Sequence, residues 1–391
     1  MLAATGTLQN TNEIGFGYEA DGVKAKPSTG NTLTWKFSAQ NVHDFVWAAD
    51  PNYAIMKRQI KNGPLFYFVY KKVDTLQSKW KALADTIVKA YPFIAKTFGP
   101  YPYKNYSFIQ GGDGYMEYPM ATLIRNVSIG ANIHEFMHSW YYGLMGNNES
   151  LYPWMDEGFA TYAELRVSGW LRGDTIFPFT NAYDSYSRLV RSKLEEPMST
   201  HADHYNTNYA YETSSYSKGS IFLVQLGYIV GDKALDRILL EYYDEWRYKH
   251  PNPSDFIRVA EKVSGLELQW YKEYWVYTTK TIDYAIGDVN DDKGNAKITI
   301  TRAGLMPMPV DVLITYKDGT KEMHYIPLNM MYGVKPAEDN TPRIVHPEWK
   351  WVDTDYSFTL TKKVGDIKEI EIDPSKRMAD VNRVNNKITV P

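Results

Sequence analysis

Two histidines, His134 and His138, stand four residues apart in the stretch IHEFMHSWYY, and Glu135 directly follows the first of them. Residues at positions i and i+4 lie one turn apart on the same face of a helix, so two imidazole rings at this spacing can bind one metal ion. Glu135 would then lie roughly a hundred degrees around the helix from His134, beside the ion and not bound to it. Taken alone, the stretch allows two interpretations: a hydrolytic metal site, or a helix that carries these residues without that role.

A catalytic zinc site needs a third protein ligand and leaves one position for water. The chain has no cysteine, so any metal ion must be held by His, Asp or Glu. Glu157, in the stretch LYPWMDEGFATYAEL, is separated from His138 by 18 residues, among which GNNES and Pro153 allow a turn between two helices. These ligands favour one zinc ion, although manganese, cobalt or iron could bind the same set.

The HEFMH motif, followed at this distance by Glu157, resembles the gluzincin metallopeptidases. GYMEY upstream and YSKG downstream narrow the resemblance to the aminopeptidase N and leukotriene hydrolase family. The three motifs run from Gly114 to Gly219, and the order of strands and helices extends the resemblance over nearly the whole chain. The resemblance implies a zinc-dependent aminopeptidase, which hydrolyses the N-terminal peptide bond of peptides by attack of a zinc-bound water.

The same resemblance implies a role for each matched residue. His134, His138 and Glu157 match the zinc ligands, and Glu135 matches the general base that takes a proton from the water. Such a base is chemically sensible because zinc lowers the pKa of its water to about 7. Tyr216 of SSYSKG matches the tyrosine that donates to the oxyanion of the tetrahedral intermediate. In a chain with 32 tyrosines a plain core residue is the alternative, but the adjoining KGSIFLVQLG helix favours the catalytic role.

Substrate binding is implied for the loop GYMEY, with Gly114, Met116 and Glu117. Glu117 matches the glutamate that binds the free α-amino group, and such a pairing would place the first peptide bond at the metal ion. The sequence departs from the family pattern at Tyr118, where Asn is usual, and in having only 16 residues between Glu117 and His134. The alternative is an ordinary loop acid.

Glu164 stands seven residues beyond Glu157 and would share its helix face. It could hold a ligand histidine through the second ring nitrogen. A solvated acid on a helix is the alternative.

The remaining sequence predicts an α+β fold. Strand-like alternation in LTWKFSAQ and PLFYFVYKKV indicates that residues 1–72 are the remnant of an N-terminal β domain. Helical spacing dominates residues 73–280, which we expect to form a thermolysin-like catalytic domain. The period returns to two in residues 281–391, where Asp318-Gly319 predicts a hairpin turn, and we expect a C-terminal β-sandwich.

The composition is that of a globular protein, with 44% hydrophobic residues, 23% charged residues and a net charge of −3 among 391 residues. Because there is no basic excess, we expect no nucleic-acid partner, and no run reaches the roughly 18 apolar residues of a membrane span. The opening MLAATGTLQN lacks the regions of a signal peptide. The compartment is therefore left open, with an extracytoplasmic location favoured and the signal peptide absent from this chain. The oligomeric state is not predicted.

Three further motifs carry less weight. HADH at 201–204 has no carboxylate partner at metal spacing, and DVNDDKG at 288–294 places its glycine at the seventh position instead of the sixth that a calcium loop needs. QNVHDFVWAADP at 40–51 resembles the end of the family's N-terminal domain. We expect a solvated loop, a hairpin or interdomain loop, and a structural segment, respectively.

The family's N-terminal domain is larger than 72 residues, and many members have a helical C-terminal domain, so we expect the chain to lack most of both. Two alternatives follow: an endopeptidase of thermolysin type, which needs no amine anchor, or a catalytically impaired zinc-binding interaction module. Lipid epoxide hydrolysis, an activity of one branch of the family, has no feature of the sequence in its favour.

Overall fold

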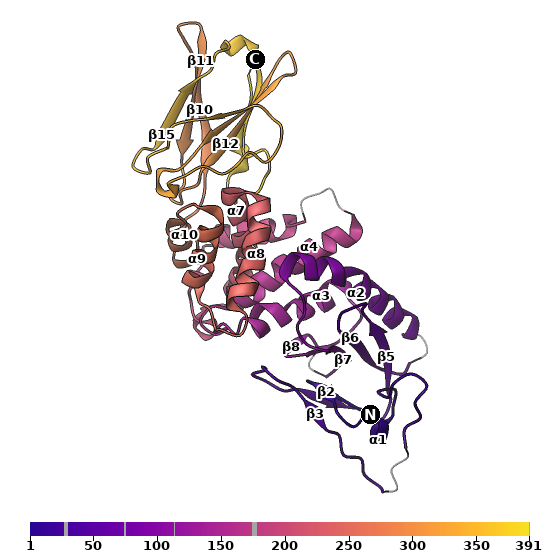
Figure 1. The fold of residues 1–391 in the computed structure, drawn as a ribbon. Helices are drawn as coiled ribbons and strands as arrows, with labels where there is room; N and C mark the ends of the chain where they lie inside the picture. Colours follow the sequence, from indigo (N-terminus) through magenta and orange to yellow (C-terminus); the bar gives the residue numbers. More distant parts are fainter. Residues whose placement is uncertain (27–29, 74–75, 113, 174–177, 391) are drawn as a thin grey trace. The chain divides into compact units, whose positions relative to one another are not determined.

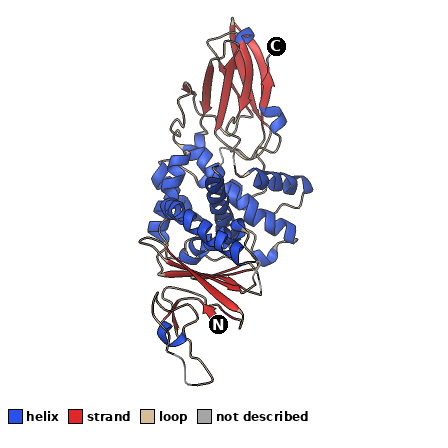
Figure 2. Cartoon of the chain, turned by 90° about the vertical axis from the view of Figure 1, so that its right-hand side faces the viewer, coloured by secondary structure: helices blue, strands red, loops and turns tan. Residues whose placement is uncertain are grey.

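The computed structural model describes residues 1–26, 30–73, 76–112, 114–173 and 178–390. The chain forms two compact units. The first consists of Met1–Asn148, Met155–Pro178 and Tyr243–His250, and the second of Glu149–Trp154, Phe179–Tyr242 and Pro251–Pro391. Figures 1 and 2 show strands and helices in each.

A five-stranded sheet lies at the centre of the first unit, with strand order β5-β6-β7-β9-β8. Its inner strands β6, β7 and β9 are parallel, whereas β5 and β8 pair antiparallel at the two edges. The strands are β5 (Tyr53–Gln59), β6 (Leu65–Lys71), β7 (Asn105–Gln110), β8 (Met116–Tyr118) and β9 (Ala121–Ile124).

Both faces of this sheet are covered, because apolar side chains alternate between them along β6 and β7. Phe66 and Phe108 contact the ring of Phe136 on the helical face. Their neighbours Tyr67 and Ile109 belong to the core on the other face, which the N-terminal segment covers. That segment contains the pairs β1 (Leu2–Ala4) with β4 (Trp47–Ala49) and β2 (Thr7–Leu8) with β3 (Phe37–Ser38), and the short helix α1 (Thr11–Ile14).

Three helices of the first unit each have one end that the sequence marks. α2 (Gln77–Phe98) ends at Gly99, whose φ of 97° a residue with a side chain rarely adopts. α3 (Ile129–Met137) begins at Ser128, whose hydroxyl caps the backbone N–H of Ala131. α4 (Phe159–Arg172) ends at Gly173 in the left-handed conformation. α2 agrees with the helical spacing that the sequence has beyond residue 73, and the predicted helix around the histidines is confirmed.

Three short π-helical turns adjoin α-helices in the described part of the chain. They are η1 (Ser139–Leu144), η2 (Trp154–Gly158) and η4 (Thr213–Lys218). A π turn adds a residue to the helical period and is often found at functional sites. Each of the three follows or contains a residue that the sequence marks as functional.

The helices of the second unit precede its strands. α7 is buried at every residue, as its uniformly apolar sequence predicts. α9 begins with a capping box between Asn252 and Asp255, with Pro253 at its first position. The helical elements are α5 (Thr180–Ser192), η3 (Ala202–His204), α6 (Asn208–Glu212), α7 (Gly219–Val230), α8 (Asp232–Trp246, which continues into the first unit), α9 (Pro253–Ser264) and α10 (Gln269–Tyr277).

A three-stranded and a five-stranded sheet form the β-rich end of the second unit. The C-terminal β-sandwich stays a prediction. The predicted hairpin at Asp318-Gly319 joins β12 to β13, and Gly319 has a φ of 85°. Residues 288–292 of the DVNDDKG motif end strand β10, and its last two residues, Lys293 and Gly294, form the hairpin turn to β11. The strands are β10 (Tyr284–Asp292), β11 (Asn295–Arg302) and β15 (Asp355–Thr359) in one sheet, and β12 (Val310–Tyr316), β13 (Lys321–Ile326), β14 (Arg343–Val345), β16 (Ile367–Ile372) and β17 (Lys387–Thr389) in the other. Single turns η5 (Asn329–Met331), η6 (Val364–Asp366) and η7 (Arg383–Asn386) lie between them.

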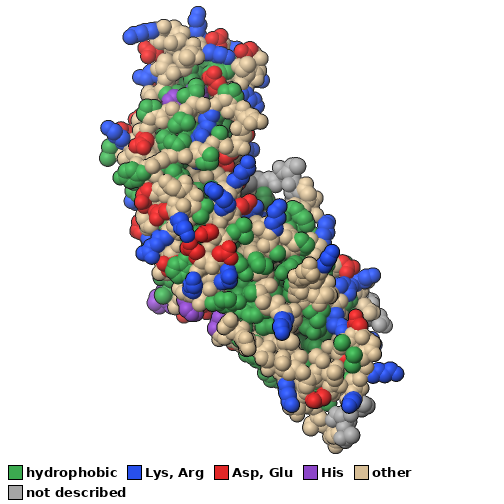
Figure 3. Space-filling view, viewed as in Figure 1, with side chains coloured by type: hydrophobic (Ala, Val, Ile, Leu, Met, Phe, Trp, Pro, Cys, Tyr) green, Lys and Arg blue, Asp and Glu red, His purple; other side chains and the backbone are tan. Residues whose placement is uncertain are grey.

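The surface carries charges of both signs. On the face shown in Figure 3, Lys and Arg side chains are interspersed with Asp and Glu side chains. Among the described residues, no helix has the length and apolar character needed to cross a membrane.

Candidate metal centre

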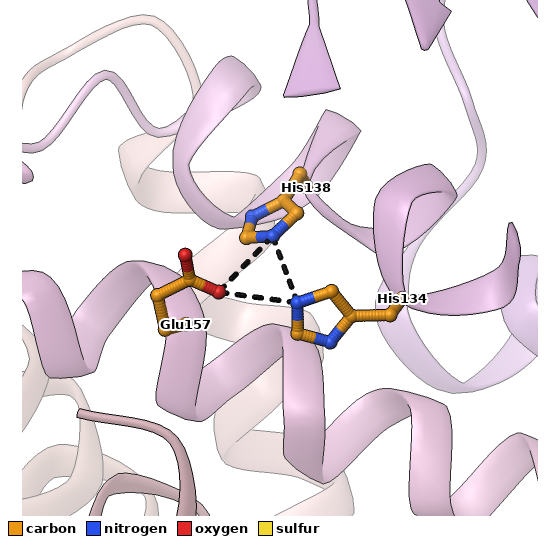
Figure 4. Close-up of side chains that lie close together, drawn as sticks. All are labelled: His134, His138 and Glu157. Carbon is orange, nitrogen blue, oxygen red and sulfur yellow. Dashed lines mark hydrogen bonds and ion pairs between the residues drawn. The ribbon is translucent and has the colours of Figure 1, made fainter. Parts of the chain in front are cut away.

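The two histidines lie at the end of α3, and the glutamate comes from the π turn η2 that leads into α4 (Figure 4). Nε2 of His134 lies 3.1 Å from Nε2 of His138 and 3.1 Å from Oε2 of Glu157. The third side of this triangle, from Nε2 of His138 to Oε2 of Glu157, is 3.3 Å. The structure thus brings all three predicted ligands together.

These distances fit a zinc ion. In a tetrahedral site with bonds of roughly 2 Å, neighbouring ligand atoms lie about 3.3 Å apart. Two neutral imidazole nitrogens and one carboxylate oxygen are also the donor set that suits zinc without thiolate ligands. The three residues therefore fit a zinc ion.

The second ring nitrogen of His138, Nδ1, has two hydrogen-bond partners. It lies 2.6 Å from Oδ1 of Asp156 and 2.8 Å from the carbonyl oxygen of Tyr141, in η1. The side chains of His138 and Asp156 are 2% and 5% exposed, so water does not compete for this contact. An Nδ1–H that donates to the aspartate leaves the lone pair of Nε2 directed toward the metal position.

The charges of the site oppose one another. Burial lowers the pKa of His134, although the bond to Glu157 acts in the other direction. Burial also acts to lower the pKa of His138, but Asp156 and Glu157 outweigh it and raise this pKa well above its usual range. The pKa of Glu157 is lowered because His138 and His134 outweigh its burial. The shifts thus favour a positive charge on His138, a neutral His134 and a negative charge on Glu157. A divalent cation held by the three side chains would also favour the Glu157 carboxylate.

Glu135 lies beside the triad, as its position on α3 predicts. Its side chain is buried, and within the described structure its Oε2 makes no hydrogen bond. Burial raises the pKa of Glu135 to about 8, with further contributions from Glu117 and Glu157 against the opposite effect of His138. A divalent cation at the triad would lower this pKa again, because a nearby positive charge favours the carboxylate.

Glu117 comes to the same site from the edge strand β8. One carboxylate oxygen of Glu117, one ring nitrogen of His138 and one carboxylate oxygen of Asp156 lie within 4.8 Å of one another. The strand is fixed by its register with β9, in which Glu117 pairs with Thr122, and by the bond from the Thr122 hydroxyl to the Met116 carbonyl. The predicted substrate residue Glu117 therefore lies next to the predicted metal ligands.

The other two residues predicted for substrate binding lie in and before β8. Gly114 has a φ of 57°, and a Cβ there would approach the Cβ of Arg125 to 2.8 Å, so the turn requires glycine. Met116 is 38% exposed. Their roles in substrate binding stay predictions.

Glu164 lies against α3, one turn before His134. A Cβ at Gly130 would be 2.8 Å from Oε1 of Glu164, so the missing side chain makes room for this carboxylate. Burial raises the pKa of Glu164 to about 7. The prediction that it holds a ligand histidine is consistent with this position and stays a prediction.

Tyr216 lies on η4 of the second unit and is partly buried there. Its predicted role as oxyanion donor stays a prediction. HADH at 201–204 contains the single turn η3, in which the rings of His201 and His204 stack 4.7 Å apart.

Asp156 is the residue that sequence reasoning missed. The signal was present, because Asp156 directly precedes the third ligand in the DEG triplet. Reasoning from the α-helical period led to Glu164 instead. Asp156 and Glu157 lie on the π turn η2, whose wider period directs both carboxylates toward the histidines.

The model of the peptidase family M1 domain matches residues 84–275. Residues 84–275 belong to peptidase family M1. The family resemblance predicted from HEFMH, GYMEY and YSKG is therefore confirmed.

Two curated relatives are similar in sequence to this chain. Leucine aminopeptidase 2-1 of Meyerozyma guilliermondii is 26% identical over 262 residues, which are 58% of this chain and 41% of the relative. A leukotriene A-4 hydrolase homolog of Botryotinia fuckeliana is 28% identical over 212 residues, which are 47% of this chain and 31% of the relative. The alignments thus span less than half the length of these relatives.

A solved structure shares the fold. Aminopeptidase A of Legionella pneumophila, in complex with aspartic acid, superimposes with a TM-score of 0.59 over 86% of this chain and 38% of that chain. The sequence identity is 12%, so this likeness concerns the fold alone. It confirms the predicted α+β class.

Proposed function

We propose that this chain is a zinc-dependent aminopeptidase, which hydrolyses the first peptide bond of peptides that have a free N-terminus. Three lines support the proposal: the M1 domain at residues 84–275, the triad of His134, His138 and Glu157, and the carboxylate of Glu117 next to it. The position of Glu117 is what favours an aminopeptidase over a metallopeptidase that does not recognise the α-amine.

His134, His138 and Glu157 would hold the zinc ion. When bound there, zinc would acidify a water molecule and polarise the scissile carbonyl group. Glu135, buried beside the triad, would take the proton from the attacking water and deliver it to the leaving amine.

Glu117 would anchor the α-ammonium group of the substrate. An ammonium paired with a carboxylate forms a charge-assisted hydrogen bond, which is stronger than a neutral one. Because Glu117 is fixed by β9 within a few ångströms of the ligands, the anchored amine fixes which peptide bond reaches the metal position. An endopeptidase needs no such anchor.

Tyr216 would donate its phenolic hydrogen to the oxyanion that forms during attack. The family match of YSKG supports this assignment. A neutral donor directed at the developing negative charge typically contributes about 10²–10³ in rate.

A panel of aminoacyl arylamides, compared with the same compounds acetylated on the α-amine, tests the proposal. We expect turnover of the free amines that 1,10-phenanthroline abolishes and its non-chelating 1,7 isomer leaves intact. Equal turnover of the acetylated compounds would favour an endopeptidase, and turnover that survives the chelator would contradict the zinc mechanism. Bound zinc without any turnover would favour the binding module.

A further inference from the structure

Two consecutive glutamates, Glu195 and Glu196, hold the two ends of the segment that carries Tyr216. This segment, residues 206–218, contains α6 and the π turn η4. Glu196 accepts hydrogen bonds from the backbone N–H and the side-chain amide of Asn206, each at 2.9 Å. Glu195 reaches the far end, where its Oε1 lies 2.8 Å from Nζ of Lys218.

The ion pair between Glu195 and Lys218 is buried. The two side chains are 6% and 1% exposed. The ammonium of Lys218 also lies 3.4 Å from the carbonyl oxygen of Thr278 and 5.1 Å from the ring centre of Trp275. An ion pair in such surroundings is costly to form and often contributes little net stability, so its best-supported use is to fix a unique arrangement.

The backbone at the same point is fixed as well. The carbonyl oxygen of Lys218 accepts a hydrogen bond from the indole Nε1–H of Trp275, at 3.3 Å. The last residue of η4 is therefore held through both its side chain and its main chain, two residues beyond Tyr216. π-helical turns are rare and occur mostly as single turns within α-helices, frequently at functional sites.

We infer that Lys218 and Glu195 are positioning residues for Tyr216: the buried pair fixes the π turn and thereby directs the tyrosine hydroxyl. This inference rests on the proposed function of Tyr216 as oxyanion donor. The Lys218 ammonium is buried against Glu195 and Trp275, so in this proposal it acts through Tyr216.

The test is a double-mutant cycle. In the wild-type background, Lys218→Met with Glu195→Gln removes both charges together and avoids a lone buried charge. We expect kcat to fall by up to about a hundredfold, as for a misplaced catalytic group, with KM little changed. In a Tyr216→Phe background the tyrosine hydroxyl is already absent, so the same pair of substitutions should change kcat by less than about twofold, which is the usual scatter of such a cycle.

A matched control removes another buried ion pair of the second unit. Lys335 and Asp311 lie 2.6 Å apart and are 3% and 10% exposed. Lys335→Met with Asp311→Asn should lower the melting temperature in a similar way and leave kcat unchanged. An equal fall in kcat in the control, or an equal fall in both Tyr216 backgrounds, would overturn the inference.

Hydrogen exchange gives a readout that does not need turnover. We expect faster exchange in residues 208–218 of the Lys218/Glu195 variant but not of the control. If the variant fails to fold, Glu196→Ala offers a milder change, because it removes the contact to Asn206 at the more exposed end of the segment 206–218. It should also lower kcat and speed up exchange, to a smaller extent. Unchanged exchange in the Lys218/Glu195 variant would overturn the inference that this pair fixes the π turn. If exchange changes as expected but the wild-type chain has no chelator-sensitive turnover, only the proposed function is overturned.

Discussion

The imidazole ring of His138 bridges two acidic residues: its Nδ1 lies 2.6 Å from Oδ1 of Asp156, and its Nε2 lies 3.3 Å from Oε2 of Glu157. The two acids are neighbours in the chain and reach opposite edges of the same ring. Asp156 therefore fixes the tautomer and the orientation of the ring, while Glu157 lies where the ligands converge.

Replacing Asp156 should weaken the binding of zinc. We expect Asp156→Ala to raise the zinc dissociation constant about 10–100-fold, the usual effect of losing a partner of a ligand histidine, and Asp156→Asn to raise it less. Competition with a chromogenic chelator measures the constant. Asp85→Asn, at a half-exposed carboxylate on α2, is the control. An unchanged constant for Asp156→Ala would mean that the Tyr141 carbonyl holds His138 alone.

Glu135→Gln should separate metal binding from turnover. The triad does not include Glu135, so we expect a full complement of zinc. Loss of the proton acceptor should lower kcat about 10²–10⁴-fold. Metal analysis together with steady-state kinetics on an aminoacyl arylamide checks both expectations. A variant that lost its zinc would show that Glu135 shapes the metal site, and a variant with normal kcat would remove it as the base.

Glu117→Gln should act on recognition of the α-amine. The amide keeps the size of the side chain but removes its charge, and hydrogen bonds to charged groups contribute about 1.5–3 kcal/mol. We therefore expect kcat/KM for free-amine substrates to fall roughly 10–100-fold, with zinc affinity nearly unchanged. The discrimination against acetylated substrates should fall by the same factor. If the variant keeps that discrimination, Glu117 is not the anchor.

Sequence reasoning recovered those parts of the fold that depend on periodicity and turn chemistry. The apolar spacing of α2, the alternation of β12 and the Asp318-Gly319 hairpin were all predictable, because burial of one face imposes a period on the chain. The ligand triad was also predictable, since one α-helical turn separates His134 from His138.

The π turns could not be predicted in this way. Each of them inserts one residue into a helical period, and no pattern of apolar residues marks that insertion. The α-helical period marks Glu164 as a possible partner of a ligand histidine and does not mark Asp156, which contacts Nδ1 of His138. The parallel pairing of β6 with β7, which places α3 over the sheet, is equally invisible to local reasoning because it joins residues about forty positions apart.

The last prediction concerns two histidines in the β-rich end of the second unit. Nδ1 of His324, on β13, lies 2.8 Å from Nε2 of His346, just after β14. The ring of Phe358 stacks on that of His324 and lies tilted against that of His346. Burial lowers the pKa of His324 to about 4, with a contribution from His346 and against the opposite effect of Glu322. The folded state therefore favours the neutral form of the His324 imidazole.

The sign of the pH dependence follows from this lowered pKa. Between about pH 6.5 and 4 the unfolded chain binds a proton that folded His324 does not, so stability is complete above about pH 6.5 and declines as the pH falls. At pH 5 the loss from His324 is at most about 2 kcal/mol. Hydrogen exchange, corrected for its intrinsic pH dependence, should show weaker protection of β13 and β14 at pH 5 than at pH 7.5. His324→Gln should flatten this difference and His204→Gln, in an exposed loop, should not; equal pH profiles in all three proteins would contradict the prediction.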